Sequence, residues 1–167
     1  MYTVGELVTY GALGVMRISD IREETVQDIT RSYYILEQIK GDDGSKTYVP
    51  VDNERLVAAM RPLISADEAH SLCEKIKELP LLEISKDNRA RTEKFRAVIE
   101  SGDREAMLSM IKTVRAMARE REAVGKKGYI SDTNMQNKAA KILYSELSYV
   151  LGVPESEMSA YLEPYFD

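Results

Sequence analysis

The sequence predicts an α+β protein, in which a small and strongly curved β-barrel at the N-terminus is followed by an α-helical bundle. Three observations predict this order. Apolar residues within residues 4–18 recur every second residue or in short runs that glycines interrupt. Aromatic and β-branched residues, which favour strands, are prominent in the same part of the chain. From residue 65 onward, apolar residues recur instead at helical spacing.

The first part of the barrel should consist of short, bent strands within residues 4–18. The apolar pattern there is broken at Gly5, Gly11 and Gly14, and glycine relieves steric conflict where a chain turns tightly. The paired carboxylates Glu23 and Glu24 fall in a predicted turn and are interpreted as ordinary solvated loop residues.

A hairpin should complete the barrel. Tyr33–Ile39 is predicted as one strand and Thr47–Val51 as its return, with a turn at Gly41-Asp42-Asp43-Gly44 between them. Pro50 cannot donate a hydrogen bond to a neighbouring strand. The returning strand should therefore end at a sheet edge or lie on one.

A domain boundary is expected near residue 64. Asn53–Met60 fits a short helix or a turn that packs on the sheet, and Arg61-Pro62-Leu63-Ile64 should end the first domain. Ser65-Ala66-Asp67-Glu68 has the S-x-x-E form of a capping box, which predicts a helix from about Asp67 that Pro80 ends. The chain thus divides into residues 1–64 and 65–167.

Further helices should build the bundle. Asp87 or Ser85 is expected to cap one helix that ends at Ser101-Gly102-Asp103. The longest helix should span about Arg104–Val124, with Lys112, Arg115 and Arg119 on an outer face. Ser131 is expected to cap the next helix, and a last one should follow Pro154.

Composition indicates a globular protein of the cytoplasm. The 167 residues are 44% hydrophobic and 31% charged, which is unlike a disordered tail. No apolar run approaches the length of a membrane helix, and no signal sequence is apparent at the N-terminus. The single cysteine, Cys73, excludes an internal disulfide framework and favours a reducing compartment.

Charge is unevenly distributed along the chain. The net charge is −5, which argues against a free-standing nucleic-acid binder. Residues 86–127, however, contain 12 Lys and Arg against 7 Asp and Glu, whereas both flanking segments are acidic. This distribution suits a protein that a protein partner delivers to DNA.

The order of motifs resembles one bacterial family. V-G-x-x-V-x-Y-x-x-x-G-V-x-x-I at residues 4–18, Y-Y-x-L at 33–36 and V-P-V at 49–51 resemble the N-terminal module of the CarD/CdnL transcription regulators. The RNA-polymerase-interacting domain of transcription-repair coupling factor has a related module. The helical second half extends the resemblance to CarD/CdnL over nearly the whole chain.

The resemblance implies that the barrel docks edge-to-edge on the β subunit of RNA polymerase, since an edge strand has unsatisfied N–H and C=O groups. Where some relatives carry arginines, this chain has Glu24 and Tyr48, so backbone pairing is expected without those salt bridges. The same residues also have a purely structural interpretation, as the interior of the barrel. The matching residues are Tyr34, Leu36, Thr47, Tyr48, Val49 and Pro50.

The resemblance further implies that the helical domain contacts promoter DNA, because lysine and arginine neutralise phosphates. Asn88 stands where relatives commonly place a tryptophan that wedges into the minor groove; asparagine can bond base edges but cannot stack. Either phosphate contacts replace the wedge, or the DNA role has diverged. The alternative for the basic residues is a solvated helix face with ion pairs. The expected DNA-facing residues are Asn88, Arg89, Arg91, Lys94 and Arg96, and then Lys86, Lys112, Arg115, Arg119, Lys126 and Lys127.

The sequence therefore predicts a transcription regulator that is not an enzyme, with a Tudor-like or SH3-like barrel and a helical domain. Its expected partners are the RNA polymerase β subunit and promoter DNA, with no cofactor, metal, membrane or small-molecule substrate. His70 and Cys73 lack the spacing of a metal or catalytic cluster, and Cys73 falls on an apolar helix stripe. The alternative is an adaptor of the transcription machinery that binds proteins and not DNA.

Overall fold

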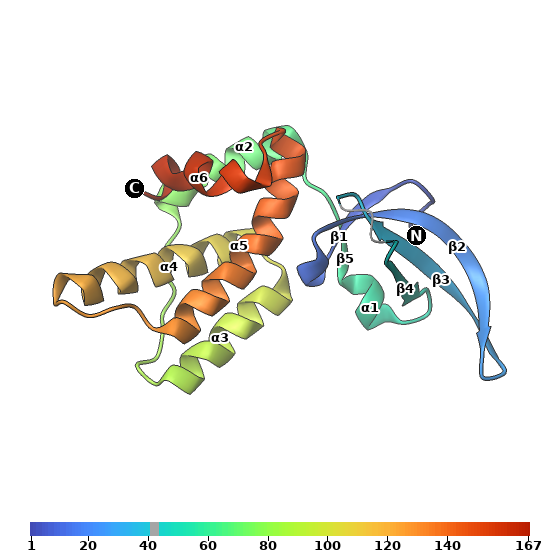
Figure 1. Ribbon diagram of the computed structural model, residues 1–167, viewed down its shortest axis with the longest axis horizontal. Helices are drawn as coiled ribbons and strands as arrows, with labels where there is room; N and C mark the ends of the chain where they lie inside the picture. Colours follow the sequence, from blue (N-terminus) through green and yellow to red (C-terminus); the bar gives the residue numbers. More distant parts are fainter. Residues whose placement is uncertain (41–43) are drawn as a thin grey trace. The chain divides into compact units, whose positions relative to one another are not determined.

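A computed structural model describes residues 1–40 and 44–167 of the chain (Figure 1). The chain divides into two compact units, Met1–Ile64 and Ser65–Asp167. The first unit contains a five-stranded antiparallel sheet, and the second consists of packed helices. The predicted α+β class is thereby confirmed.

The sheet of the first unit has the strand order β4-β3-β2-β1-β5, so β4 and β5 form its two edges. Glycine is required where the chain turns between the first two strands, since Gly14 has a φ of 79° that other residues adopt at a cost. Positions 41–43 of the predicted loop lie outside the described residues. The strands are β1 (Leu7–Tyr10), β2 (Val15–Val26), β3 (Ile29–Gln38), β4 (Lys46–Pro50) and β5 (Met60–Pro62).

The hairpin of β2 and β3 is longer than the sequence pattern suggested. Gln27 and Asp28 form its two-residue turn, both with positive φ, which is the conformation that suits a tight antiparallel hairpin. Glu23 and Glu24 therefore lie within β2, and their assignment to a turn is wrong. The error has a physical cause, since polar side chains exposed on a two-stranded ribbon give no alternating apolar signal.

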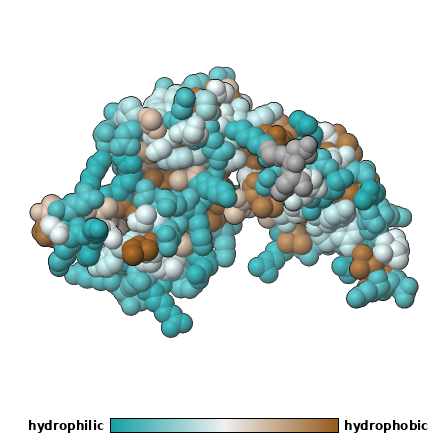
Figure 2. Space-filling view, viewed as in Figure 1, coloured by the Kyte–Doolittle hydropathy of each residue, from teal (hydrophilic) through white to brown (hydrophobic). Residues whose placement is uncertain are grey.

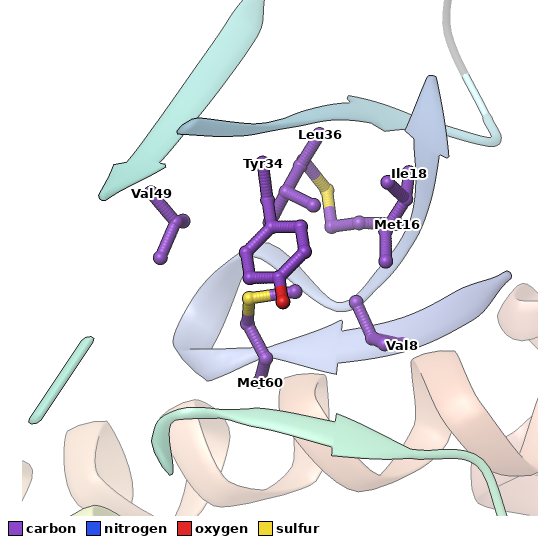
Figure 3. Packing of buried hydrophobic residues seen from close by; sticks show 7 residues of the cluster. All are labelled: Val8, Met16, Ile18, Tyr34, Leu36, Val49 and Met60. Carbon is purple, nitrogen blue, oxygen red and sulfur yellow. The ribbon is translucent and has the colours of Figure 1, made fainter. Parts of the chain in front are cut away.

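The core of the first unit lies on one face of this sheet. Its seven buried residues come from all five strands, as Figure 3 shows. The short helix α1 (Glu54–Ala58), which Asn53 caps, packs against them with Leu56 and Val57. The core residues are Val8, Met16, Ile18, Tyr34, Leu36, Val49 and Met60.

The second unit consists of five α-helices and two short 3-10 turns. They are α2 (Ala66–Lys75), η2 (Ile76–Glu78), α3 (Asn88–Ser101), α4 (Arg104–Ala123), α5 (Ile130–Leu151), η3 (Glu155–Glu157) and α6 (Met158–Phe166). The Asp87 side chain caps α3, and the Asp103 side chain caps α4. Asp87 is one of the two caps that the sequence predicts for α3. Ser131 does not cap α5: the cap is Tyr129, and Ser131 lies inside the first turn.

The bundle interior is built mainly from α4 and α5. Met107, Met110, Ile111 and Val114 of the predicted apolar face are buried. From α5, the buried apolar residues recur every four positions, at Met135, Ala139, Leu143 and Leu147. This periodicity is why both long helices could be predicted from sequence.

Removing the capping box of α2 should destabilise the helical unit measurably. The Ser65 hydroxyl accepts from the Glu68 N–H at 3.1 Å, and the Glu68 carboxylate accepts from the Ser65 N–H at 2.7 Å. Ser65→Ala should lower the free energy of unfolding by about 1 kcal/mol. Ser71→Ala is the matched control, since Ser71 is exposed in the same helix. Equal effects of the two changes in urea unfolding would contradict this role.

Acid should weaken the same capping box. The hydrogen bond from the Ser65 backbone lowers the pKa of Glu68, so the unfolded chain binds its proton more readily than the folded one. The contribution of Glu68 to stability is thus present above its ordinary pKa and is lost as the pH falls through the lowered value.

Candidate functional site

Strand β4 is one of the two edge strands of the first unit, the other being β5. The Val51 N–H donates to the Ser32 carbonyl at 2.9 Å, and β3 and β4 pair in register with Tyr34 opposite Val49 and Ile35 opposite Tyr48. In an antiparallel ladder, hydrogen-bonded and non-bonded pairs alternate. The N–H and C=O of Tyr48 therefore point away from β3, towards the open edge.

The side chains predicted for the partner interface are divided between two faces. Tyr34, Leu36 and Val49 are buried in the core cluster (Figure 3), and so their side chains are not available to a partner. Thr47 and Pro50 are partly buried. Tyr48 is 43% exposed, and it alone of the six combines an outward backbone with an exposed side chain.

A shallow concave site lies on the opposite face of the sheet from the core, next to β4. Its cavity of about 340 Å³ is lined by Glu24, Val26, Tyr33 and Tyr48. The two tyrosine rings meet edge to face, with centroids 6.1 Å apart. We call this the outer-face pocket. Sequence reasoning missed it, because it requires the β2–β3 register, which brings distant residues together.

The outer-face pocket has an ion pair at its rim. Arg22 Nε donates to Glu24 Oε1 at 2.7 Å, and Arg22 Nη2 reaches the Tyr48 hydroxyl at 3.5 Å. This hydrogen bond to Glu24 raises the pKa of the Arg22 guanidinium. Arg31 on β3 pairs with Glu24 in the sheet register, but its side chain does not bond to Glu24. Its Nε lies instead 3.8 Å from Asp52 Oδ2.

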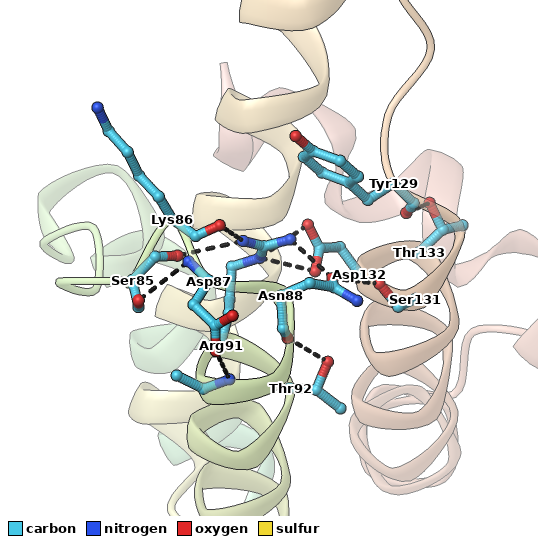
Figure 4. A network of polar contacts seen from close by, with 11 residues as sticks. Ser85, Lys86, Asp87, Asn88, Arg91, Thr92, Tyr129, Ser131, Asp132 and Thr133 are labelled. Carbon is cyan, nitrogen blue, oxygen red and sulfur yellow. Dashed lines mark hydrogen bonds and ion pairs between the residues drawn. The ribbon is translucent and has the colours of Figure 1, made fainter.

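The second unit contains a buried polar network where α3 and α5 begin, shown in Figure 4. Arg91 Nε donates to both carboxylate oxygens of Asp132, at 2.9 and 3.1 Å. Arg91 Nη1 donates to the carbonyl oxygens of Ser85 and Lys86, and Nη2 donates to Asn88 Oδ1 at 2.9 Å. The network joins the segment before α3 to the first turn of α5.

Arg91 is therefore not part of an exposed basic surface, and the expectation that it faces outward is wrong. Its side chain is 2% exposed, and Asp132 is 3% exposed. Asn88 is exposed, but its side-chain oxygen accepts from both Arg91 and Ser131. No sequence signal marks this pair, because Arg91 and Asp132 are 41 positions apart.

Most of the other basic residues that the sequence assigned to the DNA-facing surface also make hydrogen bonds or ion pairs within the helical unit. Lys94 donates to the Glu83 carbonyl oxygen, and Arg96 pairs with Glu93. Lys112 donates to three carbonyl oxygens at the end of η2. Arg115 and Arg119 pair with Glu163 and Asp167 at the C-terminal end of the chain. The predicted outer basic face of α4 therefore binds other parts of the same unit.

Four basic side chains remain exposed around the network, two before or within the first turn of α3 and two in the α4–α5 turn. None of the four makes a side-chain hydrogen bond or ion pair with the residues that the structure describes. In Figure 4, the Lys86 side chain extends away from the network. We call them the basic end of the helical unit: Lys86, Arg89, Lys126 and Lys127.

Hydrogen bonds to Arg121 hold the backbone of the α4–α5 turn, which contains Lys126 and Lys127. Arg121 Nε donates to the Lys127 carbonyl oxygen at 2.7 Å, and its guanidinium lies 3.9 Å from the centre of the Tyr129 ring. Arg91 lies 4.9 Å from the same ring. Tyr129 thus contacts one arginine from α4 and one from α3, which links the turn to the polar network.

The first unit matches a known domain family. Residues 2–64 match the CarD-like/TRCF RID domain. The match covers the N-terminal sheet and ends just before α2, and it agrees with the CarD/CdnL resemblance of the sequence motifs. A domain of this type suggests a transcription-associated role. No curated protein matches the chain.

The RID-type domain belongs to a family that is typically non-catalytic. In the described residues, no group of three His, Cys, Asp or Glu side chains is placed to hold a metal ion. Cys73 is buried, and burial raises the pKa of its thiol, which suits a core residue better than a nucleophile. His70 is exposed. None of the described helices is long and apolar enough to span a membrane.

Proposed function

We propose that this protein is a non-enzymatic transcription regulator that binds the RNA polymerase β subunit and promoter DNA. Residues 1–64 bind the polymerase through the β4 edge. Residues 65–167 contact DNA at the upstream edge of the transcription bubble and alter the stability of the open complex. The observation that carries the proposal is an open strand edge in an RID-type domain.

The β4 edge supports pairing with a strand of the polymerase. Its outward backbone groups at Tyr48 can extend the sheet by one strand, in the manner of β-augmentation. Pro50, which ends the strand, limits such pairing to a short segment. Backbone hydrogen bonds supply affinity in this mode, and the neighbouring side chains supply specificity.

The basic end supports a weak contact with DNA phosphates. Lys86, Arg89, Lys126 and Lys127 can release counterions from DNA, an attraction that depends on charge and not on sequence. Four cations on a chain of net charge −5 favour delivery by a partner over independent binding. The polymerase contact would raise the local DNA concentration and so make a weak contact effective.

The second candidate is an adaptor that binds two proteins and not DNA. It is favoured by the internal use of Arg91, Lys112, Arg115 and Arg119, which leaves far fewer free cations than the sequence suggests. Asn88 also lacks the apolar ring that wedges between bases in relatives.

Neutralising the basic end separates the two candidates. In the chain carrying Lys86→Ala, Arg89→Ala, Lys126→Ala and Lys127→Ala, the lifetime of open promoter complexes should return to the value without the regulator. The salt dependence of the effect should be lost as well. Polymerase binding should be unchanged, because these residues lie in the helical unit.

Lys138→Ala with Lys141→Ala is a control for loss of positive charge, since both residues are exposed on α5, away from its first turn. If the four-residue variant alters open complexes as strongly as the original chain, the adaptor is the better account.

A further inference from the structure

Two arginines of α4 are paired with carboxylates at the C-terminal end of the helical unit. Arg115 pairs with Glu163 of α6, and Arg119 Nη2 donates to Asp167 Oδ1 at 2.8 Å. The two arginines are four residues apart, and so are the two acids, so that each pair is repeated one helical turn further on. Figure 2 shows hydrophilic surface on the side of the unit where the ends of α4 and α6 lie. We call these contacts the α4–α6 ion pairs.

The segment that supplies the acids has charge of one sign only. Residues 155–167 contain four Asp and Glu and no Lys or Arg. The helix α6 packs into the unit through its buried apolar residues, Met158, Leu162 and Phe166. Its position therefore does not depend on the ion pairs, and the carboxylates could exchange partners while α6 stays in place.

The α4–α6 ion pairs are open to water, unlike the buried pair in the polar network. The Arg119 and Asp167 side chains are 60% and 56% exposed. Glu163 is 47% exposed, and Arg115 is the most covered of the four at 23%. Exposed ion pairs contribute little to stability, because water and salt screen them. Another anion can therefore replace these carboxylates at small cost.

A DNA phosphate suits the two arginines as well as a carboxylate does, since a guanidinium donates to the oxygens of either anion in the same forked geometry. Arg119 lies one turn before the end of α4 at Ala123. The α4–α5 turn that follows contains Lys126 and Lys127 of the basic end. DNA bound at the basic end would therefore bring phosphates to the same end of α4.

We propose that Glu163 and Asp167 compete with DNA phosphates for Arg115 and Arg119, so that the C-terminal helix limits the affinity of the helical unit for DNA. The helix stays packed, and only the carboxylates are displaced. Binding would be strong only where the polymerase holds DNA at high local concentration. The inference rests on the proposed contact with promoter DNA and names an internal regulator of that contact.

Neutralising the two acids tests the proposal. The binding constant of the full chain is measured at about 50 to 200 mM salt, for polymerase with promoter DNA and for polymerase alone. In the chain carrying Glu163→Gln and Asp167→Asn, the slope of log binding constant against log salt with DNA should become steeper by about 1.8, or about 0.9 for each freed arginine. Binding to polymerase alone should be unchanged.

Glu74→Gln with Glu157→Gln is the matched control. It removes the same charge from two exposed residues, neither of which forms an ion pair with α4 in the described chain. Its slope should equal that of the original chain. Asp167→Asn alone should steepen the slope by about 0.9, and the addition of Arg119→Gln should cancel this gain. Circular dichroism would establish that each variant is folded.

The outcomes separate this inference from the proposed function. An unchanged slope in the double variant, an equal gain in the control, or a gain that Arg119→Gln does not cancel would overturn the inference and leave the DNA contact intact. If the original chain binds polymerase with no greater salt dependence when promoter DNA is present, the proposed DNA contact fails, and this inference with it.

Discussion

Replacing Arg91 with alanine is expected to lower the free energy of unfolding of the helical unit by about 3–5 kcal/mol. The change would leave Asp132 buried at 3% exposure without its cation. It would also remove one of the two donors to Asn88 Oδ1 and the donor to the carbonyl oxygens of Ser85 and Lys86. Arg91→Lys should also be destabilising, since an ammonium group cannot make the forked contacts of a guanidinium.

Urea unfolding followed by helical circular dichroism measures this effect, since almost all helices of the described chain belong to the second unit. Arg89→Ala is the matched control, because Arg89 is two residues away on the same helix and is exposed. The control should change stability by about 0.5 kcal/mol or less. If Arg91→Ala lowers the free energy of unfolding no more than the control does, the network does not stabilise the unit. Arg91 would then be better interpreted as a surface residue.

Placing proline at position 48 is expected to weaken binding to the polymerase lobe by about a hundredfold or more. Proline would remove the N–H that points to the open edge, leave a carbonyl of the added strand without its donor and place a ring in its path. The fold should tolerate the change, because this N–H does not pair with β3 and proline is compatible with edge strands.

Tyr48→Ala is the control that separates the backbone from the ring. It keeps the outward N–H and removes only the side chain that lines the outer-face pocket. We expect its loss of affinity to be clearly smaller than that of Tyr48→Pro. Equal losses would indicate that the ring, and not strand pairing, provides the contact. A thermal unfolding curve for each variant would establish that the sheet is retained.

Local signals were sufficient to predict much of the fold. Ser65 and Glu68 form the predicted capping box, and Asp87 caps α3. The α4 helix spans Arg104–Ala123, one residue short of its predicted end, but its prediction as the longest helix is wrong, since α5 has 22 residues and α4 has 20. Pro50 marked β4 as an edge strand, which the sheet order confirms. Each of these features depends on residues within one turn or one strand, where intrinsic preferences act directly.

Features that depend on distant pairs could not be predicted. The three-residue strand β5 exists because it pairs with β1, whose partner residues lie 50 or more positions earlier. Arg91 matches the spacing of a basic helix face, and only Asp132 on another helix makes it a buried residue. Tyr34 and Leu36 were predicted as partner contacts, but the sheet register directs their side chains to the core. Exposure of a charged or aromatic residue is a tertiary property that composition does not determine.

Hydrogen exchange of the full chain, with and without the purified β-subunit lobe, tests most directly the claim that β4 binds the polymerase. The account predicts a complex in which the Tyr48 amide exchanges much more slowly, because its N–H gains a partner from the added strand. Exchange in the helical unit should remain unchanged with the lobe alone. Absence of a complex, or a complex that slows exchange only in α3 and α5 and not in β4, would contradict the account.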